Sequence, residues 1–526
     1  MSEILNPGLQ WVMVSAAQAF VLTLVLSPVV LWWYRRRVAH WMCEGGGDRE
    51  AAQPSAPFGP PPRWVRLPPL PGEAAKSLSF AGACALAPGQ LRLVVGHAVS
   101  GGVCALLLAA AFLTLYPQYI TTAVVATVLL VALVPTAGLV MVLQGTNSRQ
   151  RVLGAVAVCA LPWALPDDLQ GLAGSLYPVF VAVPLALLLV FSLRFWRGVA
   201  PMVLLVALAA SALAVAMALL ASRGFGAETV WHWRLTGLLV GAWVGYRSLQ
   251  ALKRAFDAGR LSDLDLFTDA WWLALLMLQA TVLAVMADQP AYLALVAAYP
   301  LVVGVRRTLW RRMPLAPASQ DATARPLLLL RVFSEEGRMA ALFDPLEQYW
   351  RHLGPIHMIA GWDLALRNIG PTDFVAFVAG RLRTQFIGNA QDLQARLESL
   401  PTQRDADGRF RVSHFWCHAN TWQPTMRALA ARSHAVLMDL RGFTGDRQGC
   451  CYELLHLARH APELPVLLLV DSPQVYAELQ RLLGGVESTS AAWMVADVGT
   501  ETAVLPQQWL ARLATSPAPT PKEMQA

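Results

Sequence analysis

The residues best suited to chemistry lie between Asp439 and Glu453. The stretch Asp439-Leu440-Arg441-Gly442-Phe443-Thr444 ends an apolar run that starts at Ala435, and Gly449-Cys450-Cys451-Tyr452-Glu453-Leu454-Leu455 then begins a helical pattern. A strand followed by a loop and a helix is typical of α/β sheets, in which ligands bind beyond the carboxyl ends of the strands. We therefore expect Glu453 to border a cleft, with Asp439 and Arg441 as ligand-binding residues at the strand end.

The carboxylates near this strand end allow more than one reading. Asp439 and Asp471 each end an apolar run, so the two could hold a cation together, or each could cap the turn that follows. Glu453 could act on a ligand, or it could stabilise the start of its helix, where an acidic side chain contributes about 0.3–1 kcal/mol. The residue types alone leave these alternatives open.

Other motifs of nucleotide and metal chemistry are missing from the sequence. It has no Walker A loop, no G-x-G-x-x-G after the first strand of this region and no H-E-x-x-H, so ATPase, dinucleotide dehydrogenase and zincin readings have no support. His414, Cys417 and His418 lie close together without a second ligand cluster, and no metal site is expected. The seven cysteines form no CxxC pair and no evident disulfide framework, and the topology predicted below places the soluble ones in the reducing cytoplasm.

The elements that position these residues follow a Pro/Ala/Ser linker at 314–326. Short apolar runs then alternate with amphipathic segments, which predicts a doubly wound parallel sheet over 327–515, with a disordered tail at 516–526. The predicted strands are Leu327 to Phe333, Ile356 to Ala360, Ala435 to Leu440, Val466 to Val470 and Trp493 to Ala496. The predicted helices are Gly337 to Leu353, Gln391 to Leu400, Pro424 to Ala431, Gly449 to Arg459 and Pro473 to Leu483.

This region resembles a Toll/interleukin-receptor (TIR) domain. The resemblance lies in Arg331-Val332-Phe333-Ser334-Glu335-Glu336, in Ser433-His434-Ala435-Val436-Leu437-Met438 and in Gly449-Cys450-Cys451-Tyr452-Glu453-Leu454, which is similar to the family's W-C-x-x-E-L helix start with Gly449 in place of tryptophan. It implies a flavodoxin-like parallel sheet and self-association of the domain. In members that cleave NAD, it implies that Glu453 holds the ribose and opposes the positive charge of the sugar, with Phe333 and Ser334 lining the crevice. NAD would then be a substrate, and no other cofactor is implied.

The sequence predicts that the first three-fifths of the chain lies in a membrane. The whole sequence is 56% hydrophobic and 14% charged, with a mean hydropathy of +0.45, which is too apolar for one soluble domain. We expect an α-helical multi-pass domain over 1–313 with about nine spans, where eight or ten would also fit. The predicted spans are Trp11 to Trp33, Val94 to Tyr116, Tyr119 to Leu143, Val152 to Leu165, Leu172 to Leu193, Val199 to Ser222, Leu235 to Tyr246, Ala270 to Met286 and Ala291 to Val305.

The distribution of charge predicts the orientation of these spans. Nine spans with the N-terminus outside place nearly all Arg and Lys of the short loops on the cytoplasmic side, as expected for a multi-pass protein of a bacterial inner membrane. The formal charge of +7 then reflects topology. Beyond residue 320 the acidic and basic residues nearly balance, so the expected partner is the lipid bilayer and not a nucleic acid.

Two further features bear on function. A cytoplasmic loop at 41–92 contains Pro60-Pro61-Pro62-Arg63-Trp64, which predicts an extended strap or disorder. The spans carry few ionisable residues, with His97, Arg234 and Asp269 near their ends, and this favours a tether or sensor over a transporter. We therefore expect a membrane-anchored signalling or stress/defence protein with a TIR-like domain, and the residues leave open whether that domain is an NAD-cleaving hydrolase. A non-catalytic interaction or sensor module and a transporter with a regulatory domain are the alternatives.

Overall fold

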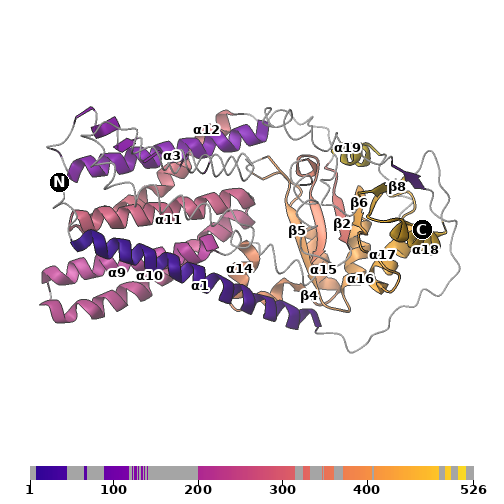
Figure 1. The fold of residues 1–526 in the computed structure, drawn as a ribbon, viewed down its shortest axis with the longest axis horizontal. Helices are drawn as coiled ribbons and strands as arrows, with labels where there is room; N and C mark the ends of the chain where they lie inside the picture. Colours follow the sequence, from indigo (N-terminus) through magenta and orange to yellow (C-terminus); the bar gives the residue numbers. More distant parts are fainter. Residues whose placement is uncertain are drawn as a thin grey trace. The chain divides into compact units, whose positions relative to one another are not determined.

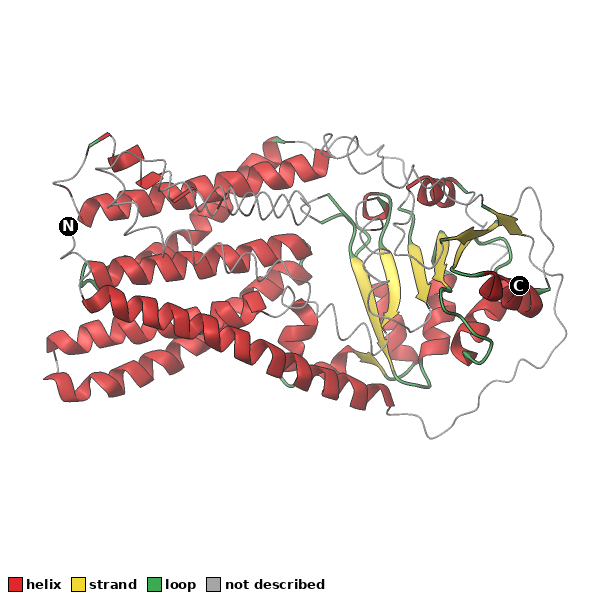
Figure 2. Ribbon diagram, in the orientation of Figure 1, coloured by secondary structure: helices red, strands yellow, loops and turns green. Residues whose placement is uncertain are grey.

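The computed structural model describes residues 7–43, 64–67, 88–115, 200–224, 226–313, 324–331, 346, 349–360, 371–405, 408–484, 492–498 and 507–516, with single positions between 117 and 139. The chain divides into two compact units (Figure 1). The first consists of Met1–Trp33, Ala87–Pro317 and Ile369–Val375. The second consists of Tyr34–Leu86, Ala318–Asn368 and Ala376–Ala526. Within the described residues the first unit is helical, and all strands belong to the second (Figure 2).

The first unit is built from long apolar helices. They are α1 (Pro7–Cys43, whose last residues belong to the second unit), α3 (Pro88–Leu115), α9 (Ala200–Gly224), α10 (Gly226–Asp257), α11 (Asp263–Met286), the 3₁₀ helix η6 (Pro290–Ala298) and α12 (Tyr299–Arg312). Four stretches of the described residues are long and apolar enough to cross a membrane, namely Val94–Leu115, Met202–Gly224, Asp265–Met286 and Pro290–Arg312. The helical, membrane-compatible character of this unit is therefore as predicted.

The predicted count of nine spans is not supported by the described residues, in which four stretches qualify. Predicted spans at 152–165 and 172–193 lie outside the described residues, and most of 119–143 does too. The predicted span from Ala291 to Val305 is divided between η6 and α12, because Pro300 stands near the junction. The predicted Leu235 to Tyr246 span lies inside α10, which continues to Asp257.

Helices α9 and α10 pack along each other at very short range. Gly237, Gly241 and Gly245 lie at four-residue intervals on α10, and a Cβ added at Gly241 would lie 2.4 Å from the carbonyl oxygen of Ala209. Such spacing of small residues is typical of helix pairs in membranes, where close backbone approach provides the packing energy. On the other side of α10, Leu239 and Trp243 are 66% and 61% exposed, which suits contact with lipid.

The second unit contains one parallel sheet. Its strands are β1 (Trp64–Arg66), β2 (Leu327–Arg331), β3 (Ile356–Ala360), β4 (Phe386–Ile387), β5 (Val412–Cys417), β6 (Ala435–Asp439), β7 (Val466–Val470) and β8 (Trp493–Asp497). The strand order is β1-β8-β7-β6-β2-β3-β5-β4, and every pairing is parallel. The predicted parallel sheet is confirmed, and the five predicted strands correspond to β2, β3, β6, β7 and β8.

Helices cover the sheet because its central strands are apolar on both faces. The side chains of β6 and β7 are buried without alternation, as in sheets that have helices on each side. One core joins the sheet to α15 (Ala390–Glu398), α16 (Trp422–Ala430), α17 (Gln448–His460) and α18 (Pro473–Leu483), which match predicted helices. The other described helices are α14 (Pro371–Val378), η7 (Trp350–His352), η9 (Leu382–Gln385) and α19 (Gln507–Thr515).

The proline-rich segment between α1 and α3 supplies the edge strand β1. Trp64 and Leu67 are almost wholly buried, and the backbone N–H of Leu67 donates to the carbonyl oxygen of Val495 at 2.8 Å. Arg66 lies over the ring of Tyr476 at 4.8 Å. The expected extended strap is thus, at these residues, a strand of the sheet, which the sequence did not indicate because prolines surround it.

Candidate functional site

The chain order of the described sheet changes direction at its central strand, β2. From β2 the chain moves to β3 and β5 on one side, and it then returns to β6 on the other side of β2. Arg331 and Asp439 are register partners at the carboxyl ends of β2 and β6. Ligands of open α/β sheets bind beyond the strand ends at such a switch point, so this is the first candidate site.

Asp439 and Arg441 form an ion pair at this strand end. The Arg441 Nε donates to Asp439 Oδ1 at 2.8 Å and its Nη2 to Oδ2 at 2.7 Å, and the backbone N–H of Arg441 also donates to Oδ1 at 3.2 Å. Gly442 follows with a φ of +71°, which lets the chain turn away from the strand. Because both carboxylate oxygens are occupied by Arg441, the pair opposes the reading in which Asp439 and Asp471 hold a cation.

Glu453 is a buried residue of α17, near the middle of the helix. The residue is only 8% exposed, and its Oε2 has no hydrogen-bond partner among the described residues. Burial raises the pKa of Glu453 to about 8, because a carboxylate away from water loses its hydration. The group is therefore mainly neutral at pH 7, and the negative charge that would oppose a sugar cation is largely missing.

The structure brings some of the predicted site residues together and leaves others outside its description. Asp439 and Arg441 are bonded to each other, and Cys450, one turn before Glu453, has its Sγ 3.9 Å from the carbonyl oxygen of Arg331. Phe333 and Ser334 lie outside the described residues. The reading of Glu453 as an acid in the first turn of its helix is wrong, because α17 begins at Gln448 and has no acidic residue in that turn.

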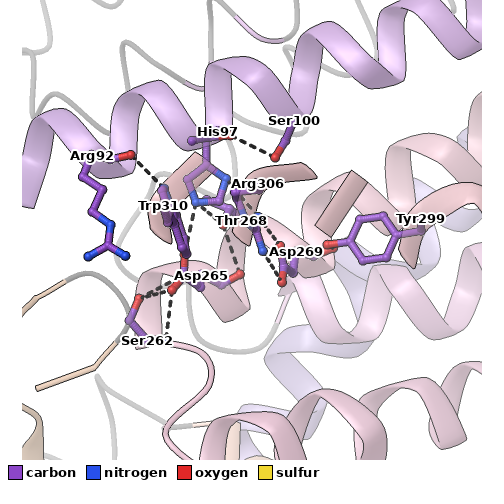
Figure 3. A network of polar contacts seen from close by, with 11 residues as sticks. Arg92, His97, Ser100, Ser262, Asp265, Thr268, Asp269, Tyr299, Arg306 and Trp310 are labelled. Atoms are coloured by element: carbon purple, nitrogen blue, oxygen red, sulfur yellow. Dashed lines mark hydrogen bonds and ion pairs between the residues drawn. The ribbon is translucent and has the colours of Figure 1, made fainter. Parts of the chain in front are cut away.

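A second candidate site lies inside the helical unit. Four ionisable side chains meet there from three helices, and none is more than 1% exposed: His97 of α3, Asp265 and Asp269 of α11, and Arg306 of α12 (Figure 3). All four lie within stretches apolar enough to span a membrane. Charged groups in such a place are costly, and in membrane proteins they mark functional positions.

Arg306 and Asp269 form the strongest contact of this cluster. The Arg306 Nη1 donates to Asp269 Oδ1 at 2.6 Å, and Nη2 donates to Oδ2 at 2.9 Å. Two parallel, charge-assisted bonds of this kind fix both distance and orientation. The ion pair therefore links α12 to α11 in the interior of the bundle.

Asp265 takes its partners from its own helix start and from α3. Ser262 caps α11 and Asp265 completes the capping box: the Ser262 Oγ donates to Asp265 Oδ2 at 2.9 Å, and the Ser262 N–H donates to the same oxygen at 3.0 Å. The other oxygen, Oδ1, lies 3.3 Å from His97 Nε2. The Thr268 hydroxyl lies 3.1 Å from the same ring nitrogen and donates to the carbonyl oxygen of Asp265 at 3.0 Å.

Compared with known proteins, the chain matches no family model, no curated protein and no solved structure. Function must therefore be argued from the two sites themselves, since a fold alone does not define an activity.

The cluster corrects one statement drawn from the sequence, that the spans are nearly free of ionisable groups. The predicted span started at Ala270, one residue after Asp269, whereas α11 begins at Asp263. Asp265 and Asp269 are four residues apart and so share a helix face, and Arg306 lies beside the predicted span that ended at Val305. The four-residue spacing of Asp265 and Asp269 was the sequence signal for this cluster. A search for purely apolar windows excludes these residues and so does not detect it.

The cluster is chemically suited to hold a proton or to respond to one. It contains two carboxylic acids, a permanent cation and an imidazole, and the imidazole is the one group among them that ordinarily titrates near neutral pH. The strand-end site, by contrast, presents a closed ion pair and a mainly neutral glutamate. The helical cluster is accordingly the stronger candidate.

Proposed function

We propose that this protein is an integral membrane signalling protein, in which the helical unit receives the signal at its buried cluster and the α/β unit responds. The observation that carries the proposal is the burial of His97, Asp265, Asp269 and Arg306 at 1% exposure or less inside apolar helices. The sequence-based placement in a bacterial inner membrane, with the α/β unit in the cytoplasm, is retained as part of the proposal.

The cost of the cluster supports a functional role. A buried ion pair often contributes little net stability compared with well-packed apolar residues, because both charges lose their hydration. Leucine and methionine at Asp269 and Arg306 would hold α11 and α12 together without that cost. A cluster whose benefit is not stability is best explained by a response to charge.

The chain offers a direct covalent route for a response. Helix α12, which carries Arg306, ends at Arg312, and β2, the strand at the switch point of the sheet, begins at Leu327. A displacement of α12 would therefore act on the segment that leads into the central strand. Such coupling needs a change of charge or packing at the first site and an element with two arrangements.

Hydrogen exchange of the full-length protein in lipid nanodiscs tests this proposal. Arg306→Gln removes the guanidinium that bonds Asp269, and Arg311→Gln removes an exposed guanidinium from the same helix as the control. We expect Arg306→Gln to change exchange in α12 and also in β2 and β6, whereas Arg311→Gln changes neither. A change confined to the helical unit would reject signalling between the units.

Transport is the second candidate, and the same cluster favours it. Ionisable side chains inside spans are typical of ion and proton pathways, so the reason for ranking transport below a tether is removed. Proton movement into vesicles that contain the purified protein distinguishes the two functions. Movement that depends on the cluster would support the transporter, and its absence would leave the signalling proposal in place.

NAD cleavage by a TIR-like α/β unit rests on the resemblance alone, and the neutral state of Glu453 speaks against it. An electrostatic role for Glu453 requires the ionised carboxylate, whereas burial favours the protonated form. The geometry thus supports a responding module that binds or assembles better than it supports a hydrolase.

A further inference from the structure

His97 lies between the carboxylate of Asp265 and the guanidinium of Arg306 in the interior of the helical unit. Its Nε2 is 3.3 Å from Asp265 Oδ1, and its Nδ1 is 3.4 Å from Arg306 Nη1 (Figure 3). A guanidinium can only donate, so the contact with Arg306 requires a lone pair on Nδ1. The ring proton then lies on Nε2 and is donated to Asp265, which describes a neutral imidazole.

The charges of the described cluster do not balance while His97 is neutral. Asp265 and Asp269 supply two negative charges, and Arg306 supplies one positive charge that is bonded to Asp269 through both terminal nitrogens. Among the described residues, the Asp265 carboxylate accepts from neutral donors, the Ser262 N–H and hydroxyl and the His97 ring. A proton on His97 would provide the missing positive charge, and uncompensated buried charge is costly.

The two neighbours of His97 act in opposite directions. Asp265 stabilises the imidazolium, whereas the Arg306 guanidinium repels it and loses its acceptor when Nδ1 gains a proton.

The other titratable or charged groups on α3, α11 and α12 lie further from the His97 ring. On α3, Arg92 lies beside Trp310 and its side chain points away from His97 in Figure 3, and Cys104 is buried two turns beyond His97. On α12, the Tyr299 hydroxyl donates to the carbonyl oxygen of Asp269 at 3.5 Å. On α11, Asp269 is bonded to Arg306. Asp265 and Arg306 are thus the charged groups in direct contact with the ring among the described residues.

We infer that His97 is a proton-binding site and that the signal received by the helical unit is a proton. This inference rests on the proposed signalling function and names its ligand. Protonation places an N–H on Nδ1 opposite the Arg306 Nη1, which breaks the contact between His97 and Arg306 and strengthens the attraction between His97 and Asp265.

The contact that proton uptake would break lies among several others that join α3 to α12. The Trp310 Nε1 donates to the carbonyl oxygen of Arg92 at 2.9 Å, and the Trp310 ring packs where Gly96 has no side chain, since a Cβ there would lie 2.1 Å from Nε1. The His97 and Trp310 rings meet edge to face, with their centroids 6.1 Å apart. A charge on His97 therefore acts where α12 is held.

Nuclear magnetic resonance of full-length protein with ¹⁵N-labelled histidine in nanodiscs tests the inference. The His97 signal is assigned as the one missing from His97→Gln. We expect its ¹⁵N shift to report proton uptake as the pH is lowered, and we expect Asp265→Asn to weaken that uptake by about tenfold or more, equivalent to one pH unit. Asp288→Asn is the matched control, because Asp288 is exposed and pairs with Arg223 elsewhere in the same unit.

A His97 signal that stays constant from about pH 4.5 to 9, or a titration that Asp265→Asn and Asp288→Asn leave equally unchanged, would overturn the inference. If His97→Gln does not fold, the signal moved by Asp265→Asn and not by Asp288→Asn identifies His97. An effect of Arg306→Gln on the sheet together with a His97 that does not titrate would retain the signalling function and reject the proton as its input.

Discussion

Arg306 donates two hydrogen bonds to Asp269, at 2.6 and 2.9 Å, and both side chains are almost fully buried in the helical unit. Each residue comes from a different helix, and each would be an uncompensated charge without the other. The pair therefore makes the relative position of α11 and α12 sensitive to any change of charge nearby.

The first prediction concerns this pair. Asp269→Asn leaves a buried guanidinium without its charge partner, and we expect a loss of about 3–5 kcal/mol of stability. The double variant Asp269→Leu, Arg306→Met removes both charges and should recover most of that loss, because apolar side chains of similar size pack without a desolvation cost. Thermal unfolding in one detergent compares them, and equal destabilisation of the single and double variants would contradict the expectation.

The second prediction concerns the contact of α9 with α10. Gly241→Ala places a methyl group 2.4 Å from the carbonyl oxygen of Ala209, so the two backbones must separate and the helix pair should lose stability. Gly304→Ala on α12 is the control, since a Cβ there meets no atom within 4 Å, and alanine favours a helix. Thermal unfolding should rank Gly241→Ala well below Gly304→Ala, and the reverse order would show that the helices do not approach this closely.

The third prediction concerns the strand from the proline-rich segment. Trp64→Ala removes a wholly buried indole from the core shared with Trp493, and we expect the sheet unit to lose about 3–5 kcal/mol. Arg66→Ala on the same strand removes a half-exposed side chain, 51% exposed and 3.9 Å from Asp497, and should cost about 1 kcal/mol or less. Resistance of the sheet unit to proteolysis in increasing urea measures both, and equal effects would mean that β1 is not an integral strand.

The fourth prediction concerns Glu453 and pH. The pKa of Glu453 is raised to about 8 in the folded protein from an ordinary value of 4.5, so the folded state binds the extra proton between these values. The stability that this group provides is fully present below about pH 4.5 and is lost as pH rises through about 8, by up to about 1.4 kcal/mol per pH unit.

Glu453→Gln provides the test of that pH dependence, because its amide cannot ionise. Urea unfolding of the sheet unit in the full chain is measured between about pH 5 and 8. The free energy of unfolding should depend less steeply on pH in the variant than in the parent. The same variant tests NAD cleavage: if the unit cleaves NAD through the ionised Glu453, turnover should stop in Glu453→Gln. Parallel slopes in the two proteins would show that Glu453 is ionised at neutral pH and would reopen the catalytic reading.

The sheet was predictable to the extent that its strands are apolar on both faces. Leu327–Arg331 and Val466–Val470 are unbroken apolar runs that end at polar residues, and they were found. β5 was not predicted because the polar residues Ser413 and His414 interrupt its apolar pattern. β1 was missed because its partner strand lies more than 400 residues away along the chain, and pairing at that range leaves no local pattern.

The cluster in the helical unit could not be predicted as a site from local patterns. Asp265 reads locally as part of a capping box with Ser262, which it is, and that role gives no sign of the histidine contributed by α3. His97, Asp269 and Arg306 become neighbours only when three helices pack. Burial of Glu453 likewise depends on the sheet beneath α17, and a helical pattern cannot show how deep one residue will lie.

The most direct measurement of the coupling between the two units is hydrogen exchange in β2 and β6 of the full-length protein in nanodiscs. It is made at about pH 6 and about pH 8, on either side of the ordinary pKa of an imidazole. Exchange is first corrected for the intrinsic effect of pH on amide chemistry. The proposed coupling predicts a pH-dependent difference in Leu327–Arg331 and Ala435–Asp439 that disappears in His97→Gln and persists in His456→Gln, a control within the sheet unit. The same pH dependence in His97→Gln as in the parent protein would contradict it.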